Sequence, residues 1–436
     1  MVIHDPTLHP FLHFVRNVSY LFWRARPHYG RARGLPPGSL ALLPLGQWND
    51  QRYYEKKFSR YGPIFKASDL YRPAACILGI ERGREFLAQH RDALIVPAFP
   101  FNRFIPDGFL RFTDSARHQT YRPVFQSAFA PALVRDAASW MAQIFHQEFA
   151  RMANDSAQSA NGIYPPPYIE RMLLCIFARL FFGIASDSAA FPTFEKMLHI
   201  IALRRAWRVS DRAVTQTLAE MVELIENTAT QFPDTPSFVS ELARAHPQQW
   251  RDPFLLYNLI YIFQIGRSDM AGLLFWILKM LSEHPVWLER VRDENSASDL
   301  PTRIVLETLR LEQSEFLLRQ TTRDIYFENF WIPKGWFVRI CIHESHRAPA
   351  IFENPETFNP DRFRARRYTN FEYMPFGAFH KACMGEHLTL TVAKIFCQEL
   401  ARNFEWRVVQ DGAHEFNGFH WQPSLRFRMK LKQIAL

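Results

Sequence analysis

The chain has 436 residues, of which 48% are hydrophobic and 15% aromatic, and it contains 40 phenylalanines. This length exceeds the usual size of one domain, but no linker divides the sequence, so we expect one large apolar core. The formal net charge of +9 suits an acidic protein partner or an anionic membrane surface, whereas nucleic-acid binding is disfavoured because no zinc-finger, RNA-recognition or basic-zipper pattern occurs.

Residues 1–34 form a basic amphipathic segment in which arginines alternate with apolar residues at helical spacing. No run approaches the roughly 20 apolar residues that a membrane span requires, and no cleavage-type signal follows. The segment is predicted as a helix that either packs on the globule or lies on a membrane surface. Residues 34–38 (GLPPG) end it, and a second, larger domain is expected over 35–436.

The next elements combine short strands with helices. Residues 63–68 and 74–79 predict two strands around a polar turn, and 81–90 predicts a helix. Further on, His118 and Arg122 are four residues apart and therefore share one face of a helix. Such a pair is more often solvated than functional.

Residues 130–250 predict helices with a polar interruption at 153–162. The following helix, 254–281, is apolar on nearly all sides, which is typical of a helix inside a protein core. The alternative is a membrane hairpin, but Arg267 and Asp269 divide the stretch into pieces too short to span.

A possible charge cluster follows this helix. Glu307 and Arg310 are three residues apart and can pair on one helical face. The planar fork of Arg362 can share the same carboxylate. The alternative for any such pair is a solvent-exposed ion pair of little energetic value. Between these residues, 325–327 and 336–342 predict strands.

The loop 376–385 (FGAFHKACMG) precedes a helix predicted over 386–400. Cys383 lies just ahead of the N-terminus of this helix, where the helix dipole favours a thiolate. Three interpretations compete: a buried structural thiol, a zinc site with His380 and His387, or a thiolate ligand of haem iron. The chain has four other cysteines, Cys76, Cys175, Cys341 and Cys397, without a disulfide framework. This usage suits a reducing compartment, the cytoplasm.

The loop resembles the cysteine-ligand signature of the cytochrome P450 family. Five residues match it: Phe376, Gly377, His380, Cys383 and Gly385. Phe379 stands where the family usually has its second glycine, and Lys381 where arginine is common. The Glu307–Arg310 pair and the Arg362 segment also resemble family motifs and occur in the family's order. The resemblance extends from about Leu35 to the end of the chain.

This resemblance implies a mainly α fold with small β-regions that encloses haem b in a single domain. It implies that Cys383 is the axial ligand of the haem iron, with backbone N–H groups of Met384 and Gly385 directed at the sulfur. Glu307, Arg310 and Arg362 become a structural triad. Four further residues are implied as contacts of the haem propionates: His118, Arg122, Arg319 and His380.

The central helix departs from the family pattern. The family usually carries an acid followed by a threonine that supply protons for oxygen activation, but here Ser268 takes the acid's place and Asp269 the threonine's. A carboxylate and a hydroxyl are both present with their positions exchanged, so Ser268 and Asp269 are the candidate catalytic residues. Arg267 is expected to extend outward; the alternative is that it holds a substrate carboxylate.

The family resemblance implies a monooxygenase, with a role in secondary metabolism, that oxidises and most simply hydroxylates an apolar small molecule. It implies O2 as oxidant and electrons from a separate ferredoxin- or flavodoxin-type protein. The exchanged pair keeps two alternatives open. One is a peroxide-using, rearranging or coupling haem-thiolate enzyme, and the other is a haem-binding carrier or sensor. We expect a cytoplasmic protein, either free or peripheral at a membrane.

Overall fold

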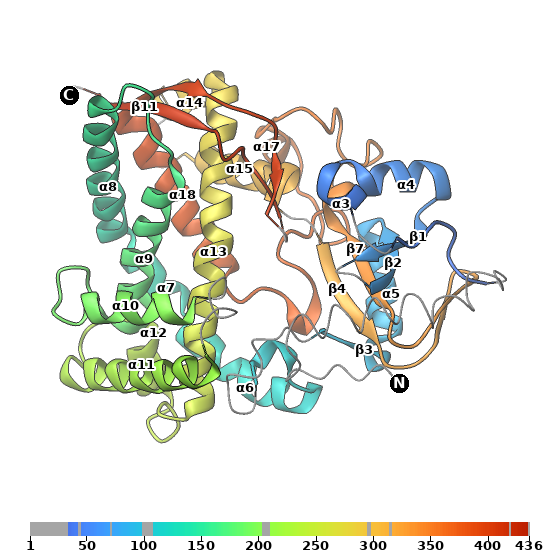
Figure 1. Ribbon diagram of the computed structural model, residues 1–436, viewed down its shortest axis with the longest axis horizontal. Coiled ribbons are helices and arrows are strands. Elements are labelled where there is room, and N and C mark those ends of the chain that lie inside the picture. Colours follow the sequence, from blue (N-terminus) through green and yellow to red (C-terminus); the bar gives the residue numbers. More distant parts are fainter. Residues whose placement is uncertain are drawn as a thin grey trace. The chain divides into compact units, whose positions relative to one another are not determined.

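The computed structural model describes residues 34–41, 45–69, 72–97, 108–202, 210–293, 298–313, 316–417 and 420–434. The predicted N-terminal segment 1–34 lies, except for Gly34, outside these residues. The chain forms two compact units, each assembled from separate stretches of sequence (Figure 1). We call them the sheet unit, from within Met1–Pro100, Leu309–Ala382 and Glu415–Trp421, and the helical unit, from within Phe101–Thr308, Cys383–His414 and Gln422–Leu436.

The sheet unit contains a five-stranded sheet in the order β1-β2-β7-β4-β3. Its strands are β1 (Ile64–Asp69), β2 (Arg72–Leu78), β3 (Leu94–Ile95), β4 (Phe316–Thr321) and β7 (Phe337–Cys341). Strands β2 and β7 pair in parallel, and the other neighbours are antiparallel. Side chains alternate between two apolar clusters: Ala75, Ile77 and Val338 belong to one, and Ala74, Cys76 and Phe337 to the other.

Short elements complete the sheet unit. The helical ones are α3 (Leu45–Asn49), α4 (Tyr53–Tyr61), α5 (Ile80–Gln89), η1 (Arg91–Ala93), η4 (Leu309–Gln313), α16 (Ile342–Ser345), α17 (Arg362–Ala365) and η5 (Phe379–Lys381). A two-stranded ribbon joins β5 (Ile325–Phe327) to β6 (Phe330–Ile332), and β9 (Glu415–Phe416) pairs with β10 (Trp421–Gln422). The strands and the helix predicted near residues 63–90 are confirmed within two residues at each end.

The helical unit is built around α13 (Pro253–Glu283). Its other long helices are α6 (Ser115–Ala128), α8 (Ala138–Gln158), α9 (Pro166–Phe182), α10 (Phe191–Ile201), α11 (Asp211–Gln231) and α18 (Glu386–Asn403). Shorter elements are η3 (Leu110–Phe112), α7 (Pro131–Asp136), α12 (Phe238–Ala245), α14 (Pro285–Asp293), α15 (Leu300–Thr308), β8 (Phe404–Gln410) and β11 (Arg428–Gln433). The prediction of a mainly α chain with small β-regions is confirmed.

Helix α13 has clear sequence signals at both ends. The Asp252 carboxylate caps its N-terminus by accepting from the Phe254 N–H at 2.9 Å, and Pro253 occupies the first helical position. Pro285 follows the end of the helix and begins the next one. No described helix combines the length and the hydropathy that crossing a bilayer requires. The core prediction for this helix is therefore supported over the hairpin.

Aromatic side chains pack around the middle of α13. Phe263 contacts four phenylalanine rings, those of Phe177, Phe181, Phe182 and Phe194, at centroid distances of 5.4 to 6.1 Å. All five rings are buried. Edge and tilted contacts of this kind add specific geometry to the burial of apolar area.

Two predicted details differ from the structure. Helix α8 continues to Gln158, so most of the polar stretch 153–162 is helical and only its end interrupts the chain. Helix α15 ends at Thr308 and continues as a π-helical turn over Leu309–Gln313. Glu307 and Arg310 therefore do not lie on one regular α-helix. Hydrophobic periodicity does not distinguish the two helix types, since they differ by one residue in the hydrogen-bond step.

Candidate active site

The cysteine loop takes a strained path before α18. Gly377 has a φ of +76°, which glycine adopts readily, but Phe379 has a φ of +56°, which a bulky side chain adopts at a cost. Phe379 stands where the resembled family usually has glycine. Its ring is 46% exposed, and the Arg84 guanidinium lies 4.6 Å from the ring centroid. This cation–π contact offsets part of the strain.

Cys383 lies directly before α18 and retains accessible surface. Burial among protein atoms nevertheless raises the pKa of its thiol, while a hydrogen bond from the Gly385 backbone N–H lowers it. The net shift is opposite to the one predicted from the helix N-terminus, because desolvation outweighs the backbone donor. The predicted donation from Gly385 is confirmed. A thiol that is both accessible and desolvated is suited to bind a positively charged ligand, because that charge would stabilise the thiolate.

The middle of α13 is the accessible part of an otherwise buried helix. Residues 264–269 all retain accessible surface, whereas most of the helix on both sides is buried. Ser268 and Asp269 are exposed, and the Asp269 charge acts on the Cys383 thiol and raises its pKa. The exchanged pair therefore includes a carboxylate within electrostatic range of Cys383.

Arg267 extends toward a different neighbour. Desolvation lowers the pKa of its guanidinium, and the Glu170 carboxylate of α9 acts in the opposite sense. Nearby, a Cβ on Gly266 would lie 3.4 Å from the Phe177 ring of the same helix. The Arg267 guanidinium is thus desolvated and its Nε is buried, which does not support the expectation that it extends outward.

Helix α6 brings a cation, Arg122, within electrostatic range of Cys383. Its N-terminus is capped by Asp114, which accepts from the Arg117 N–H at 2.8 Å. His118 is 3% exposed, and burial lowers the pKa of Arg122, with the Cys383 charge acting in the opposite sense. His118 and Arg122 are therefore not a solvated surface pair. Arg122, Asp269 and Cys383, predicted from three distant stretches, come together in the helical unit.

Two residues in the helical unit were not predicted from the sequence. Arg111 and Tyr261 act electrostatically with Asp269: the Arg111 charge lowers the pKa of Cys383 and of the Tyr261 hydroxyl, and Asp269 raises both. We call Cys383, Asp269, Arg111, Arg122 and Tyr261 the thiol site. The available signal was weak, since Arg111 precedes the Asp114 cap by only three residues but matches no motif.

The other predicted cofactor contacts belong to the sheet unit. Arg319 lies in β4, is partly buried and donates through Nη1 to the Leu318 carbonyl at 2.8 Å. His380 lies in η5, and its side chain falls outside the described part of the chain. In the helical unit, His387 of α18, considered above as a zinc ligand, contacts Thr391 through Nδ1 at 3.2 Å. Among the described residues, no group of three His, Cys, Asp or Glu side chains is placed to hold a metal ion.

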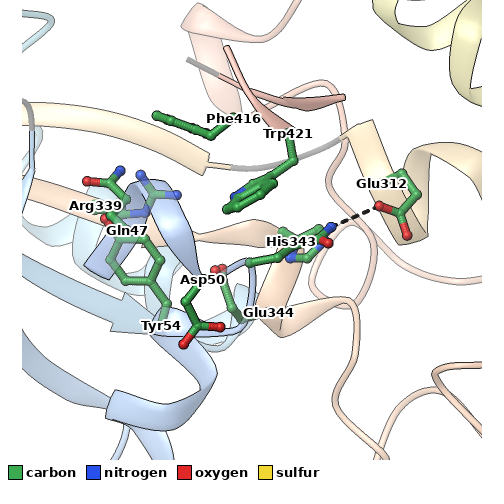
Figure 2. A pocket seen from close by; sticks show the side chains of 10 residues that line it. Gln47, Asp50, Tyr54, Glu312, Arg339, His343, Glu344, Phe416 and Trp421 are labelled. Carbon is green, nitrogen blue, oxygen red and sulfur yellow. Dashed lines mark hydrogen bonds between the residues drawn. The ribbon is translucent and has the colours of Figure 1, made fainter. Parts of the chain in front are cut away.

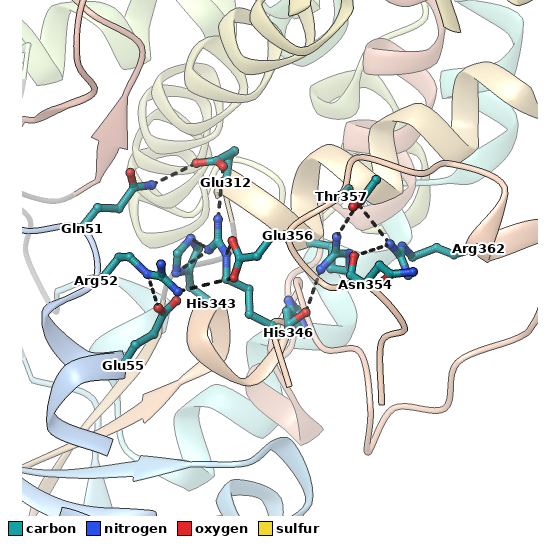
Figure 3. A network of polar contacts seen from close by, with 12 residues as sticks. Gln51, Arg52, Glu55, Glu312, His343, His346, Asn354, Glu356, Thr357 and Arg362 are labelled. Carbon is teal, nitrogen blue, oxygen red and sulfur yellow. Dashed lines mark hydrogen bonds and ion pairs between the residues drawn. The ribbon is translucent and has the colours of Figure 1, made fainter. Parts of the chain in front are cut away.

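The three residues predicted as a triad are buried rather than solvated. Glu307 and Arg310 are fully buried and Arg362 is 6% exposed, so the surface-pair alternative is wrong. In the sheet unit, Arg310 donates to the carbonyls of His346 at 2.9 Å and Thr357 at 3.4 Å. Arg362 donates to the same Thr357 carbonyl at 3.1 Å (Figure 3). Backbone carbonyls thus accept from both guanidinium groups and help to fix the segment that leads to the cysteine loop.

A separate polar pocket lies within the sheet unit, next to the buried Arg339–Asp69 ion pair of 3.0 Å (Figure 2). It has room for about one water molecule. Among the described residues, four polar atoms of its lining are buried without a hydrogen-bond partner: Gln47 Oε1, Tyr54 OH, Arg339 Nε and Glu344 Oε2. This mixture of donors and acceptors suits ordered water, so we interpret the pocket as a hydration site.

Comparison with known proteins identifies the family. Residues 36–425 match the sequence model of cytochrome P450. The chain belongs to the cytochrome P450 family. It is therefore a haem-dependent monooxygenase, and the resemblance of the cysteine loop is confirmed at the level of the family.

Named relatives cover most of this cytochrome P450. Abscisic acid 8'-hydroxylase 2 of Arabidopsis thaliana is 25% identical over 424 residues, or 86% of this chain and 85% of the relative. Putative cytochrome P450 120 of a Synechocystis species is 26% identical, over 86% of this chain and 91% of the relative. The solved cyanobacterial CYP120A1 with bound retinoic acid superposes with a TM-score of 0.76 at 23% identity, covering 92% of this chain and 100% of that one. The predicted fold is thereby confirmed.

Proposed function

We propose that Cys383 ligates the iron of haem b and that this P450 hydroxylates an apolar small molecule with O2. The observation that supports this proposal is the thiol site, where an accessible thiol in the family's cysteine loop lies within electrostatic range of Arg122 and Asp269. When bound, the haem supplies the activation of O2 on which the family's oxidations depend. Electrons are proposed to come from a separate ferredoxin- or flavodoxin-type protein.

The residues near Cys383 fit this cofactor. A thiolate ligand needs stabilisation, which the Gly385 N–H and the Arg122 charge provide. Two haem carboxylates need cations or donors, and we propose His118, Arg122, Arg319 and His380 for this role. Desolvation raises the pKa of the Cys383 thiol, but haem binding would offset this effect, because the charge of the iron is opposite to that of the thiolate.

Asp269 is the proposed proton donor, with Ser268 as its neighbouring hydroxyl. A carboxylate on an accessible stretch of α13 can take protons from water and pass them toward the reacting oxygen. One relative is named as a hydroxylase of abscisic acid, and the solved structure of CYP120A1 has retinoic acid bound. We therefore propose an apolar carboxylic acid as the first substrate to test.

The first experiment is the absorption spectrum of the reduced protein with carbon monoxide. A Soret band shifted to the red, as a thiolate ligand produces, is the expected result. A protein that contains no haem, or a haem whose band is not shifted, contradicts the assignment of Cys383.

The exchange of the acid and hydroxyl positions favours one alternative, a P450 that uses peroxide or performs a rearrangement or coupling. Turnover with hydrogen peroxide alone, and none with NAD(P)H and a reductase system, would establish it. The Asp269→Asn variant separates the two routes, since we expect it to lose product formation with O2 about tenfold but to retain peroxide turnover. Unchanged product formation with O2 removes the case for proton delivery by Asp269.

Residues 35–436 are proposed to form the catalytic domain, preceded by a basic amphipathic segment over 1–34. All five cysteines are free, which supports a reducing compartment such as the cytoplasm. Sedimentation with anionic vesicles, with and without residues 1–34, tests whether the segment is peripheral at a membrane. Equal sedimentation of the two forms would instead support packing on the globule.

A further inference from the structure

The segment that carries Arg111 is fixed onto α13. The Leu110 backbone N–H donates to Oδ1 of Asn258 at 2.6 Å, and Asn258 Nδ2 donates to the carbonyl of Gly108 at 3.4 Å. The Phe109 ring stacks on the Tyr261 ring with centroids 3.7 Å apart. Asn258 is 1% exposed and Phe109 is 3% exposed. Two buried anchors therefore hold η3 against α13.

Arg111 itself is exposed between these anchored neighbours. It lies close enough to Tyr261 to hydrogen-bond the phenol oxygen, and its charge acts on both Tyr261 and Cys383. Desolvation raises the pKa of the Tyr261 hydroxyl, so this hydroxyl stays protonated and remains a donor at neutral pH. An arginine fork and a phenol O–H form a two-donor arrangement that suits a carboxylate.

We propose that Arg111, with the Tyr261 hydroxyl, binds the carboxylate of an apolar acid substrate and so determines the substrate class. This proposal rests on the proposed function, because it uses the same site. Asp269 is the like charge that opposes a bound carboxylate, since it acts on the same two groups as Arg111. Arg111 and Asp269 therefore have opposite effects on acid binding, and this opposition gives the proposal a distinctive test.

The test measures binding by the shift of the Soret band when the haem-loaded protein is titrated. The probes are all-trans-retinoic acid and abscisic acid, each paired with its methyl ester, which keeps the shape and removes the charge. We expect each acid to bind more tightly than its ester. Arg111→Gln should weaken the binding of the acids 10- to 100-fold and that of the esters less than threefold. Arg111→Lys should recover part of the lost affinity, and Asp269→Asn should strengthen the binding of the acids.

Arg151→Gln is the matched control, because Arg151 is an exposed arginine of α8 whose ion pair with Glu148 is 3.3 Å long. The Arg151→Gln variant should change neither the affinity for the acids nor the affinity for their esters. Acids that bind no better than their esters, or an Arg111→Gln variant that weakens both equally, overturn the proposal. Loss of haem from Arg111→Gln also overturns it and assigns Arg111 to a haem carboxylate instead. The carbon monoxide spectrum of each variant reports separately on Cys383, so failure of the proposed function is distinguishable.

Discussion

The thiol site and the Arg310–Arg362 region handle charge in opposite ways. Around Cys383, charged groups keep accessible surface; desolvation lowers the pKa of Arg122 and raises that of Cys383, and nearby charges act on both. Around Arg310 and Arg362, the guanidinium groups are buried and bonded to backbone carbonyls at 2.9 to 3.5 Å. The first arrangement keeps charge at accessible positions, and the second uses charge to fix the backbone.

A conservative change of the thiol should have the largest effect. Cys383→Ser replaces the sulfur with a hydroxyl, so we expect loss of the red-shifted carbon monoxide band and a loss of monooxygenase activity of more than about 1000-fold. Cys397→Ala is the control, because Cys397 is a fully buried thiol of α18 whose pKa is raised to about 12. The control should keep the band. If both variants keep it, Cys383 is not the ligand.

Removing a buried guanidinium should instead affect folding. Arg310→Met leaves the carbonyls of His346 and Thr357 without these donors and costs about 3–5 kcal/mol in the free energy of unfolding. Urea denaturation measures this loss. Arg364→Met is the control, because Arg364 is exposed in α17 and should change stability by less than about 0.5 kcal/mol. Equal stability of the two variants would mean that the carbonyl contacts of Arg310 do not hold the fold.

The hydration site contains a buried carboxyl group, that of Glu344. Burial raises the pKa of Glu344 to about 7, against an ordinary value of 4.5. The folded state therefore binds this proton more tightly than the unfolded state, and its contribution to stability is lost as pH rises from about 4.5 to 7. Glu344→Gln should remove this loss and stabilise the protein by about 2 kcal/mol at pH 8 but little at pH 4.5. The measurement is urea denaturation at both pH values, and equal effects at the two would contradict the assignment.

Local sequence patterns predicted the elements that carry motifs. Helix α13 was predicted within two residues at each end because its apolar composition is a local signal. The pKa shift of Cys383 was predicted with the wrong sign, since desolvation of the thiol depends on protein atoms that pack around it only in the fold. Arg111 and Tyr261 were not predicted for the same reason: they are 150 residues apart and match no motif.

The substitution with the smallest expected effect is at Phe379, and it tests the backbone of the cysteine loop. Its φ of +56° lies in the region that favours glycine, so Phe379→Gly should relieve backbone strain of order 1 kcal/mol. The same change removes the Arg84 contact at 4.6 Å and increases the freedom of the unfolded chain, which together cost about as much. We therefore expect a stability change within about 1 kcal/mol, measured by urea denaturation, and an unchanged carbon monoxide band. Arg84→Gln leaves the strained residue in place but also removes the contact of the guanidinium with the Phe371 ring at 4.7 Å, so its effect sets an upper limit on the contribution of the Phe379 contact. A loss of several kcal/mol on Phe379→Gly alone would show that the phenylalanine ring, rather than the backbone, shapes the cysteine loop.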